Sequence, residues 1–251
     1  MNLFCRFFGR ILILVLALQL AGCDRGSEVV EPAKKTLVMG TSADYPPFEF
    51  IKDQQIVGFD VELAEIVANR LGYSLYMRDI SFPGLIPALK TGRIDFSVSS
   101  FARTPEREKE VDFSVSYYTP AYAILYRKGN PIDVMHLSGK SLGVQLGTSM
   151  ELFLQARLKK ENFKVIALTR TLPMIQDLKL KRLDGILLEE AQAKVFVGKN
   201  KEFDYYPFTN DDYGYAMAFP KNSKLKEQFD EVLIRMRDSG ELEDLKKKWL
   251  F

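Results

Sequence analysis

Cysteine and histidine are almost absent from this 251-residue chain. It has two cysteines, Cys5 and Cys23, both near the N-terminus, and one histidine, His136. The chain beyond Cys23 therefore has no disulfide, and neither a Cys/His metal cluster nor a Ser-His-Asp arrangement can be built convincingly from it. We expect no metal and no cofactor. Stability must come from core packing, for which roughly 215 residues suffice as one large or two modest domains.

An excess of either charge is missing too. The sequence holds 35 basic and 33 acidic residues, and Arg6 and Arg10 are the only charges before Cys23. Without these two arginines the two signs are equal in number, and we see no basic stripe. The balance argues against a nucleic-acid partner.

Long apolar runs are also scarce. The unbroken run over residues 11–18 is shorter than the about 20 residues that a bilayer-spanning helix needs, and small residues follow it. With Arg6 and Arg10 in front, the run predicts a secretion signal over residues 1–22. No other run approaches membrane length.

The signal ends in Leu20-Ala21-Gly22-Cys23, which resembles a bacterial lipobox, in which the cysteine becomes the lipidated first residue. The alternative is an ordinary signal cleaved near Gly22, with Cys23 incidental. The polar stretch that follows at once favours the lipobox, because a tether would have this composition. We expect a lipid on Cys23 as the membrane contact, a tether over residues 23–35 and an extracytoplasmic location, in the periplasm or cell envelope.

Beyond the tether, strand-like and helix-like segments alternate. Strand-like segments cover residues 36–42, 74–80, 93–100, 141–146, 164–169 and 184–189. Helix-like segments cover residues 59–71, 84–90, 150–160 and 172–181, with two more near the C-terminus at 225–236 and 242–249. Such alternation predicts layered α/β units.

The two halves of this pattern echo each other. Residues 89–95 read LKTGRID and residues 178–184 read LKLKRLD. Both place a basic helix end before a strand that opens with aspartate, so we expect two α/β lobes of similar plan. The same alignment places Ser99, Ser100 and Glu189 at the carboxyl ends of their strands, where open α/β sheets bind ligands.

The segment SSFARTPEREKE, residues 99–110, has two interpretations. As local structure it predicts a helix start, with Thr104 as N-cap and Pro105 as the first helical residue. As a functional segment it offers Arg107 beside one strand end, facing the carboxylate of Glu189 at the other. A cation and an anion that face each other across a cleft suit a zwitterion such as an α-amino acid.

Six motifs in a fixed order carry a resemblance to a known family. They are GTSADYPPFEF (40–50), VGFDVELA (57–64), GLIPALKTGRID (84–95), SSFARTPERE (99–108), GVQLGTSME (143–151) and YGYAMAFPK (213–221). From residue 35 to residue 251 the chain resembles the bacterial extracytoplasmic amino-acid-binding proteins of ABC importers, solute-binding protein family three, of the arginine or polar amino-acid type.

The resemblance implies a type II periplasmic-binding-protein fold, which is an α/β fold of two lobes with the ligand cleft between them. Two hinge crossings should lie near residues 118–121 and 212–214. Lobe 1 would join residues 36–119 with 214–251, and lobe 2 would span residues 120–213. Such a protein is a monomer, not an enzyme: it captures an amino acid by lobe closure and delivers it to an ABC permease.

Residue roles also follow from the resemblance. Arg107 would bind the ligand carboxylate, and Glu189 would hold the α-ammonium with help from the Ser100 carbonyl. Tyr45 and Phe82 would sandwich the ligand side chain. The full expected set of ligand-binding residues is Ser42, Tyr45, Phe82, Ser99, Ser100, Ala102, Arg107, Gln145, Thr148, Ser149 and Glu189. Ala102 and Glu189 depart from the family pattern, which more often has Ser or Thr and Asp at these places.

The favoured ligand is arginine or another basic amino acid. Its cationic group could stack between aromatic rings and face carboxylates. The acidic residues expected near the distal pocket are Asp44, Glu190, Asp211 and Asp212.

Two alternatives stay open. Glutamine or glutamate is the runner-up ligand, because Arg103 adds a base near the carboxylate site and Ser42 stands where binders of basic amino acids often carry aspartate. A dehydratase on a related fold is less favoured. It would need a positioned acid or base, and His136 lies away from the strand ends.

Overall fold

The computed structural model describes residues 34–209 and 213–251. The expected signal, Cys23 and the expected tether up to residue 33 lie outside the described residues. The tether was expected to end at residue 35, but the first strand already begins at Lys35. Within the described ranges, no helix combines the length and apolar composition that crossing a membrane requires.

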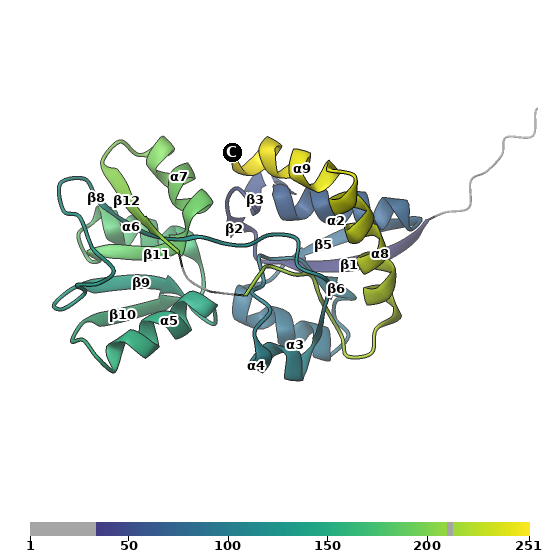
Figure 1. Cartoon of the computed structure of the whole chain (residues 1–251), viewed down its shortest axis with the longest axis horizontal. Helices are drawn as coiled ribbons and strands as arrows, with labels where there is room; N and C mark the ends of the chain where they lie inside the picture. Colours follow the sequence, from purple (N-terminus) through teal and green to yellow (C-terminus); the bar gives the residue numbers. More distant parts are fainter. Residues whose placement is uncertain (1–33, 210–212) are drawn as a thin grey trace, which may run out of the picture. The chain divides into compact units, whose positions relative to one another are not determined.

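The first of two five-stranded sheets runs in the order β5-β1-β6-β13-β7 (Figure 1). Both neighbours of β1 lie parallel to it, whereas β13 pairs antiparallel with β6 and β7. The strands are β1 (Lys35–Thr41), β5 (Tyr73–Asp79), β6 (Phe96–Ser97), β7 (Asp112–Phe113) and β13 (Ala218–Phe219). The helices packed around them are α2 (Phe59–Arg70), the 3-10 turn η2 (Phe82–Gly84), α3 (Leu85–Lys90), α4 (Pro105–Glu110), α8 (Lys224–Asp238) and α9 (Glu241–Leu250).

Strand β1 packs on both of its faces. Successive side chains of a strand point to opposite faces, and Leu37 and Met39 join one core while Val38 packs against another. Figure 1 shows α2, α8 and α9 on one side of this sheet and α3 and α4 on the other. This double cover explains why Leu37, Val38 and Met39 are consecutive apolar residues and do not alternate with polar ones.

The second five-stranded sheet runs in the order β10-β9-β11-β8-β12. Strands β10 and β11 lie parallel to β9, and β8 and β12 complete the sheet in antiparallel pairs. The strands are β8 (Tyr122–Arg127), β9 (Ser141–Gln145), β10 (Lys164–Leu168), β11 (Gly185–Glu189) and β12 (Phe203–Phe208). The helices packed against them are α5 (Ser149–Leu158), α6 (Thr171–Lys179) and α7 (Glu190–Lys199).

Two segments connect the sheets, one before β8 and one after β12. They pair with each other, because Tyr215 N–H donates to the Tyr118 carbonyl at 2.7 Å and Tyr117 N–H donates to the Tyr215 carbonyl at 2.9 Å. Residues 210–212 of the second segment lie outside the described residues. The lobe boundaries expected at residues 119 and 214 stay a prediction.

A small third sheet leads into α2. It is formed by β2 (Asp44–Tyr45), β3 (Glu49–Lys52) and β4 (Gln55–Val57), in that order and antiparallel. No local sequence pattern indicated this sheet.

The sequence echo has a structural cause. Asp95 precedes β6, and its Oδ2 accepts a hydrogen bond from the Val38 N–H of β1 at 2.7 Å. Asp184 precedes β11, and its Oδ2 accepts from the Ser141 N–H of β9 at 2.8 Å. In each half an aspartate thus satisfies a backbone donor of the neighbouring parallel strand.

The echo also exposes one difference between the halves. Gly92 has φ +68° in the first half, and the residue aligned with it in the second is Lys181, with φ +61°. A side chain in this left-handed region costs about 1 kcal/mol or more. We therefore expect Lys181→Gly to raise the melting temperature by about 2–4 °C. Calorimetry measures this, with Lys179→Gly at the last residue of α6 as the control, which should lower the melting temperature because glycine is a poor helix former and the ion pair with Glu202 at 3.5 Å is lost. An equal fall in melting temperature in both variants would contradict the prediction.

One strand is shorter than expected. Residues 93–100 were predicted as strand, but β6 covers only Phe96–Ser97. The chain leaves the sheet there, and Ser100 takes a left-handed conformation with φ +50°. This turn presents Ser99 and Ser100 at the carboxyl end of β6.

Candidate functional site

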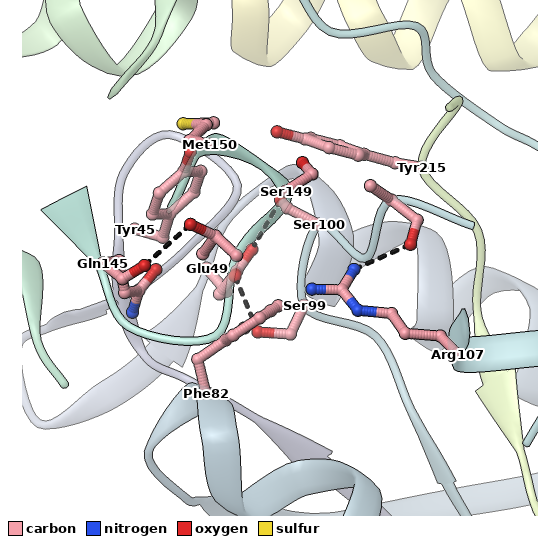
Figure 2. A pocket seen from close by; sticks show the side chains of 12 residues that line it. Tyr45, Glu49, Phe82, Ser99, Ser100, Arg107, Gln145, Ser149, Met150 and Tyr215 are labelled. Atoms are coloured by element: carbon pink, nitrogen blue, oxygen red, sulfur yellow. Dashed lines mark hydrogen bonds between the residues drawn. The ribbon is translucent and has the colours of Figure 1, made fainter. Parts of the chain in front are cut away.

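A small cavity lies where segments of the two sheets meet. Figure 2 shows side chains from both sides directed into it. Nine of the eleven residues expected to bind a ligand line this cavity: Tyr45, Phe82, Ser99, Ser100, Ala102, Arg107, Gln145, Thr148 and Ser149. The other lining residues, which were not expected from the sequence, are Glu49, Met150 and Tyr215.

Arg107 owes its place in the wall to local helix chemistry. Thr104 caps α4, because its Oγ1 accepts from the Arg107 N–H at 3.3 Å, and Pro105 is the first helical residue. The predicted helix start is therefore confirmed, and this helix start also carries the cation. The Arg107 guanidinium donates to the Ala102 carbonyl at 2.7 Å and, across the cavity, to the Gly147 carbonyl at 2.8 Å.

Aromatic rings flank the same guanidinium. Its Cζ lies 5.2 Å from the ring centroids of both Phe82 and Phe101, which are themselves 4.7 Å apart. Cation–π contacts at this distance hold the planar group in one orientation. Arg107 is therefore preorganised.

Glu49 is the carboxyl group of the cavity. Its side chain is only 1% exposed. Its Oε1 accepts from the Ser99 hydroxyl at 2.9 Å, and its Oε2 accepts from the Ser100 hydroxyl at 3.3 Å (Figure 2). Burial, together with the nearby Asp60 carboxylate, raises the pKa of Glu49 well above its usual range. The motif GTSADYPPFEF contained this residue, but no spacing rule distinguished it from its neighbours.

Asp60 supports the turn that presents Ser99 and Ser100. It is fully buried, and its Oδ2 accepts from the Ser100 N–H at 2.7 Å and from the Tyr117 hydroxyl at 2.8 Å. Burial raises the pKa of Asp60 to about 6, although these hydrogen bonds oppose the rise. The Asp60 carboxylate therefore fixes the left-handed Ser100 conformation.

Glu189 does not line the cavity, contrary to expectation. It caps α7, where its Oε2 accepts from the N–H groups of Ala191 at 2.6 Å and Gln192 at 3.2 Å, while its Oε1 accepts from the Tyr118 hydroxyl at 2.7 Å. Burial raises its pKa to about 7. The cause of the difference is local: a carboxylate at a helix N-cap bonds the helix's own first donors.

Ser42 also lies outside the cavity wall. Its backbone N–H donates to the Ser99 hydroxyl at 3.0 Å, so it orients Ser99 from behind. Its own hydroxyl donates to Asp44 at 3.2 Å. Ser42 is thus a support for the wall and not a part of it.

The expected acidic cluster does not form. Asp44 accepts from the Thr171 N–H of α6 at 2.5 Å, and Glu190 pairs with Lys194 at 3.0 Å. Asp211 and Asp212 lie outside the described residues. Glu49 is the acidic residue that lines the cavity.

The second sheet contributes polar groups from the start of α5. The Thr148 hydroxyl donates to the Gln145 carbonyl at 2.7 Å and accepts from the Glu151 N–H at 3.2 Å. The Ser149 and Tyr122 hydroxyls are 2.8 Å apart. These contacts make this wall rigid.

The cavity therefore offers one guanidinium and one carboxyl group between aromatic walls. This combination can bind a small molecule that carries both an anion and a cation. His136 takes no part, because its side chain is 84% exposed and lies 3.0 Å from Asp133. Among the described residues, no group of His, Cys, Asp and Glu has the arrangement of a metal site.

The chain is similar to proteins of a known family. The model of the family described as bacterial extracellular solute-binding proteins, family 3, matches residues 37–251. The arginine-binding extracellular protein ArtP of Bacillus subtilis is 39% identical over 246 residues, which cover 95% of this chain and 96% of ArtP.

Two solved structures are similar as well. The amino acid ABC transporter substrate-binding protein AbpA of Streptococcus pneumoniae, bound to L-arginine, has a TM-score of 0.79 at 33% identity and covers 85% of this chain and 93% of its own. An ancestral arginine-binding protein bound to glutamine has a TM-score of 0.78 at 32% identity and covers 87% and 99%.

Proposed function

The chain belongs to the bacterial extracellular solute-binding proteins of family 3, and from this premise we propose that it binds arginine or another basic amino acid. One observation carries the choice of ligand: Glu49 and Arg107 lie in the walls of one small cavity. The names of the relatives, ArtP and the arginine-bound AbpA, support the same choice.

In the proposed complex, Arg107 binds the ligand α-carboxylate as a bidentate fork. The side-chain cation lies at Glu49, whose carboxylate is already oriented by the hydroxyls of Ser99 and Ser100. Tyr45 and Phe82 provide aromatic surface along the cavity. A guanidinium benefits most, because its planar fork suits both stacking and a carboxylate.

Binding proceeds by closure and without chemistry. Contacts between segments of the two sheets support this proposal: Arg107 reaches Gly147, and Arg170 at the start of α6 pairs with Asp79 at the end of β5 at 2.8 Å. A ligand that touches both sides would favour the conformation in which these contacts exist. The closed protein would then deliver its ligand to an ABC permease, a role supported by the name of AbpA.

Glutamine is the second candidate. Gln145 lines the cavity, and the ancestral arginine-binding protein has been solved with glutamine bound. Its neutral amide would leave the Glu49 carboxyl without a cation, so we place it behind arginine.

A thermal-shift screen of the twenty amino acids tests the proposal. A ligand at 100 times its Kd stabilises by about 2.7 kcal/mol, which corresponds to a melting shift of roughly 5–10 °C for a chain of this size. We expect this shift from arginine and a smaller one from lysine. A shift with glutamine or glutamate and none with arginine or lysine would overturn the proposal.

We further propose that the protein is anchored through a lipid on Cys23. The sequence Leu20-Ala21-Gly22-Cys23 supports this. The expected result is that the wild-type protein partitions into detergent and that Cys23→Ala moves it to the aqueous phase. A variant that stays wholly in detergent would contradict the anchor.

A further inference from the structure

Two carboxyl groups, from Glu49 and Asp60, adjoin each other below the cavity floor. Both residues are almost completely buried, and both carboxyls contact the Ser100 hydroxyl, at 3.3 and 3.5 Å. They also lie within hydrogen-bonding reach of each other. Only Glu49 lines the cavity.

One oxygen of this pair needs a donor. Asp60 Oδ1 is buried and has no hydrogen-bond partner among the described residues. A buried acceptor without a donor is costly, and two adjoining carboxylates without a cation between them cannot both ionise. A single proton shared by Glu49 and Asp60 removes both costs.

The described groups around the pair do not replace this shared proton. Asp44 of β2 adds negative charge to the pair. The hydroxyl of Tyr117 already donates to Asp60 Oδ2, and the hydroxyl of Tyr45 stays protonated because burial raises its pKa well above the usual value. Arg107 of α4 is the cation of the same cavity, and the described contacts of its guanidinium are with the Ala102 and Gly147 carbonyls and the rings of Phe82 and Phe101. The other buried acid, Glu189, caps α7.

We propose, building on the function proposed above, that the ligand-free site holds one proton between Glu49 and Asp60 and releases it to solvent when a cationic ligand side chain binds. Asp60 is then a positioning residue: it touches no ligand, but it sets the charge of Glu49. An entering guanidinium or ammonium replaces the proton as the positive charge, so both carboxyls ionise. A neutral side chain leaves the proton in place.

This exchange makes affinity depend on pH in a ligand-specific way. Below the pH at which the free pair loses its shared proton, arginine must displace that proton, and its Kd rises about tenfold for each pH unit of acidification. Citrulline has the same length but a neutral ureido group, so its Kd should not show this tenfold rise per pH unit.

Calorimetric titration in two buffers of different ionisation enthalpy counts the protons released. In the wild-type protein at pH 6.5, we expect arginine to release close to one proton more than citrulline. Burial raises the pKa of Glu189 to about 7, but Glu189 does not line the cavity, so we expect the same contribution from it with both ligands and none in the difference. Glu189→Gln should accordingly keep the difference.

Asp60→Asn is the decisive variant. The carbonyl oxygen of the introduced amide can keep the bonds from Ser100 and Tyr117, while its NH2 group donates to an ionised Glu49. The arginine–citrulline difference should then fall to near zero, although arginine still binds. If this variant fails to fold, Glu49→Gln tests the same pair from the other side and should also abolish the difference.

The outcomes separate the two proposals. Binding of arginine with equal proton release for both ligands, or a full difference retained in Asp60→Asn, overturns the shared proton and leaves the proposed function standing. Binding of neither arginine nor citrulline by the wild-type protein overturns the proposed function, and the shared proton falls with it.

Discussion

Replacing Arg107 with alanine is expected to abolish most arginine binding while leaving the fold intact. Truncating one partner of a buried, charged hydrogen-bonded pair costs about 2–5 kcal/mol, which is roughly 30-fold to several thousand-fold in affinity. The guanidinium is also the group that bridges the cavity to the Gly147 carbonyl. Its loss should therefore remove the proposed ligand contact together with the contact to Gly147.

Arg103 provides the matched control for this experiment. It lies in the same segment and pairs with Glu108 on the surface, with side chains 46% and 40% exposed. Surface ion pairs contribute little, so Arg103→Ala should change the Kd by less than about threefold. The Kd of Arg107→Lys should lie between those of Arg103→Ala and Arg107→Ala, because a point charge cannot form the bidentate fork. If titration calorimetry finds that Arg107→Ala loses less than about fivefold in affinity for arginine, Arg107 does not bind the ligand and serves only as a residue of the capped helix α4.

Replacing Glu49 with glutamine is expected to weaken arginine binding and to erase the preference for a cation. A hydrogen bond to a charged group is worth about 1.5–3 kcal/mol, or about 10- to 150-fold in Kd. Glutamine binding should hold or improve, because the neutral amide no longer faces a buried acid. The ratio of the two dissociation constants, measured by calorimetry, is the readout.

Glu49→Gln should raise the stability of the ligand-free protein although it lowers the affinity for arginine. The pKa of Glu49 is raised in the folded state, so its stabilising contribution is complete below about pH 4.3, the unfolded value, and is lost as the pH rises through the folded value. A glutamine side chain does not ionise, so Glu49→Gln removes this loss of stability at high pH. The ligand-free variant should therefore melt at a higher temperature than wild type at pH 8, and by a smaller margin at pH 5.

Glu190 is the control for this second variant. It follows Glu189 in sequence but pairs with Lys194 along α7. Glu190→Gln should leave the Kd within about twofold. Similar losses in both variants would mean that general negative charge, and not the Glu49 carboxyl, attracts the ligand.

Local patterns predicted much of the fold. The helix expected at residues 59–71 is α2, at 59–70, and the helix expected at 172–181 is α6, at 171–179. These segments carry a basic residue in the last turn and apolar residues at helical spacing, so neighbours in sequence are enough to specify them. Strands β8 and β12 and helix α7 were not predicted. The two strands depend on antiparallel pairing with distant partners, β11 and β8, which no local pattern reveals.

The sequence by itself determined the α/β alternation and the cap that orients Arg107, because each rests on residues within one or two turns of chain. Only the tertiary structure decided which acid faces the ligand cavity. Glu189 stands at a helix N-cap and bonds that helix's own donors. Glu49 meets Ser99 and Ser100 only once β3 packs beside the turn after β6. A carboxylate's partners are set by which donors surround it in space, and those donors lie 50 and 51 residues away in the chain.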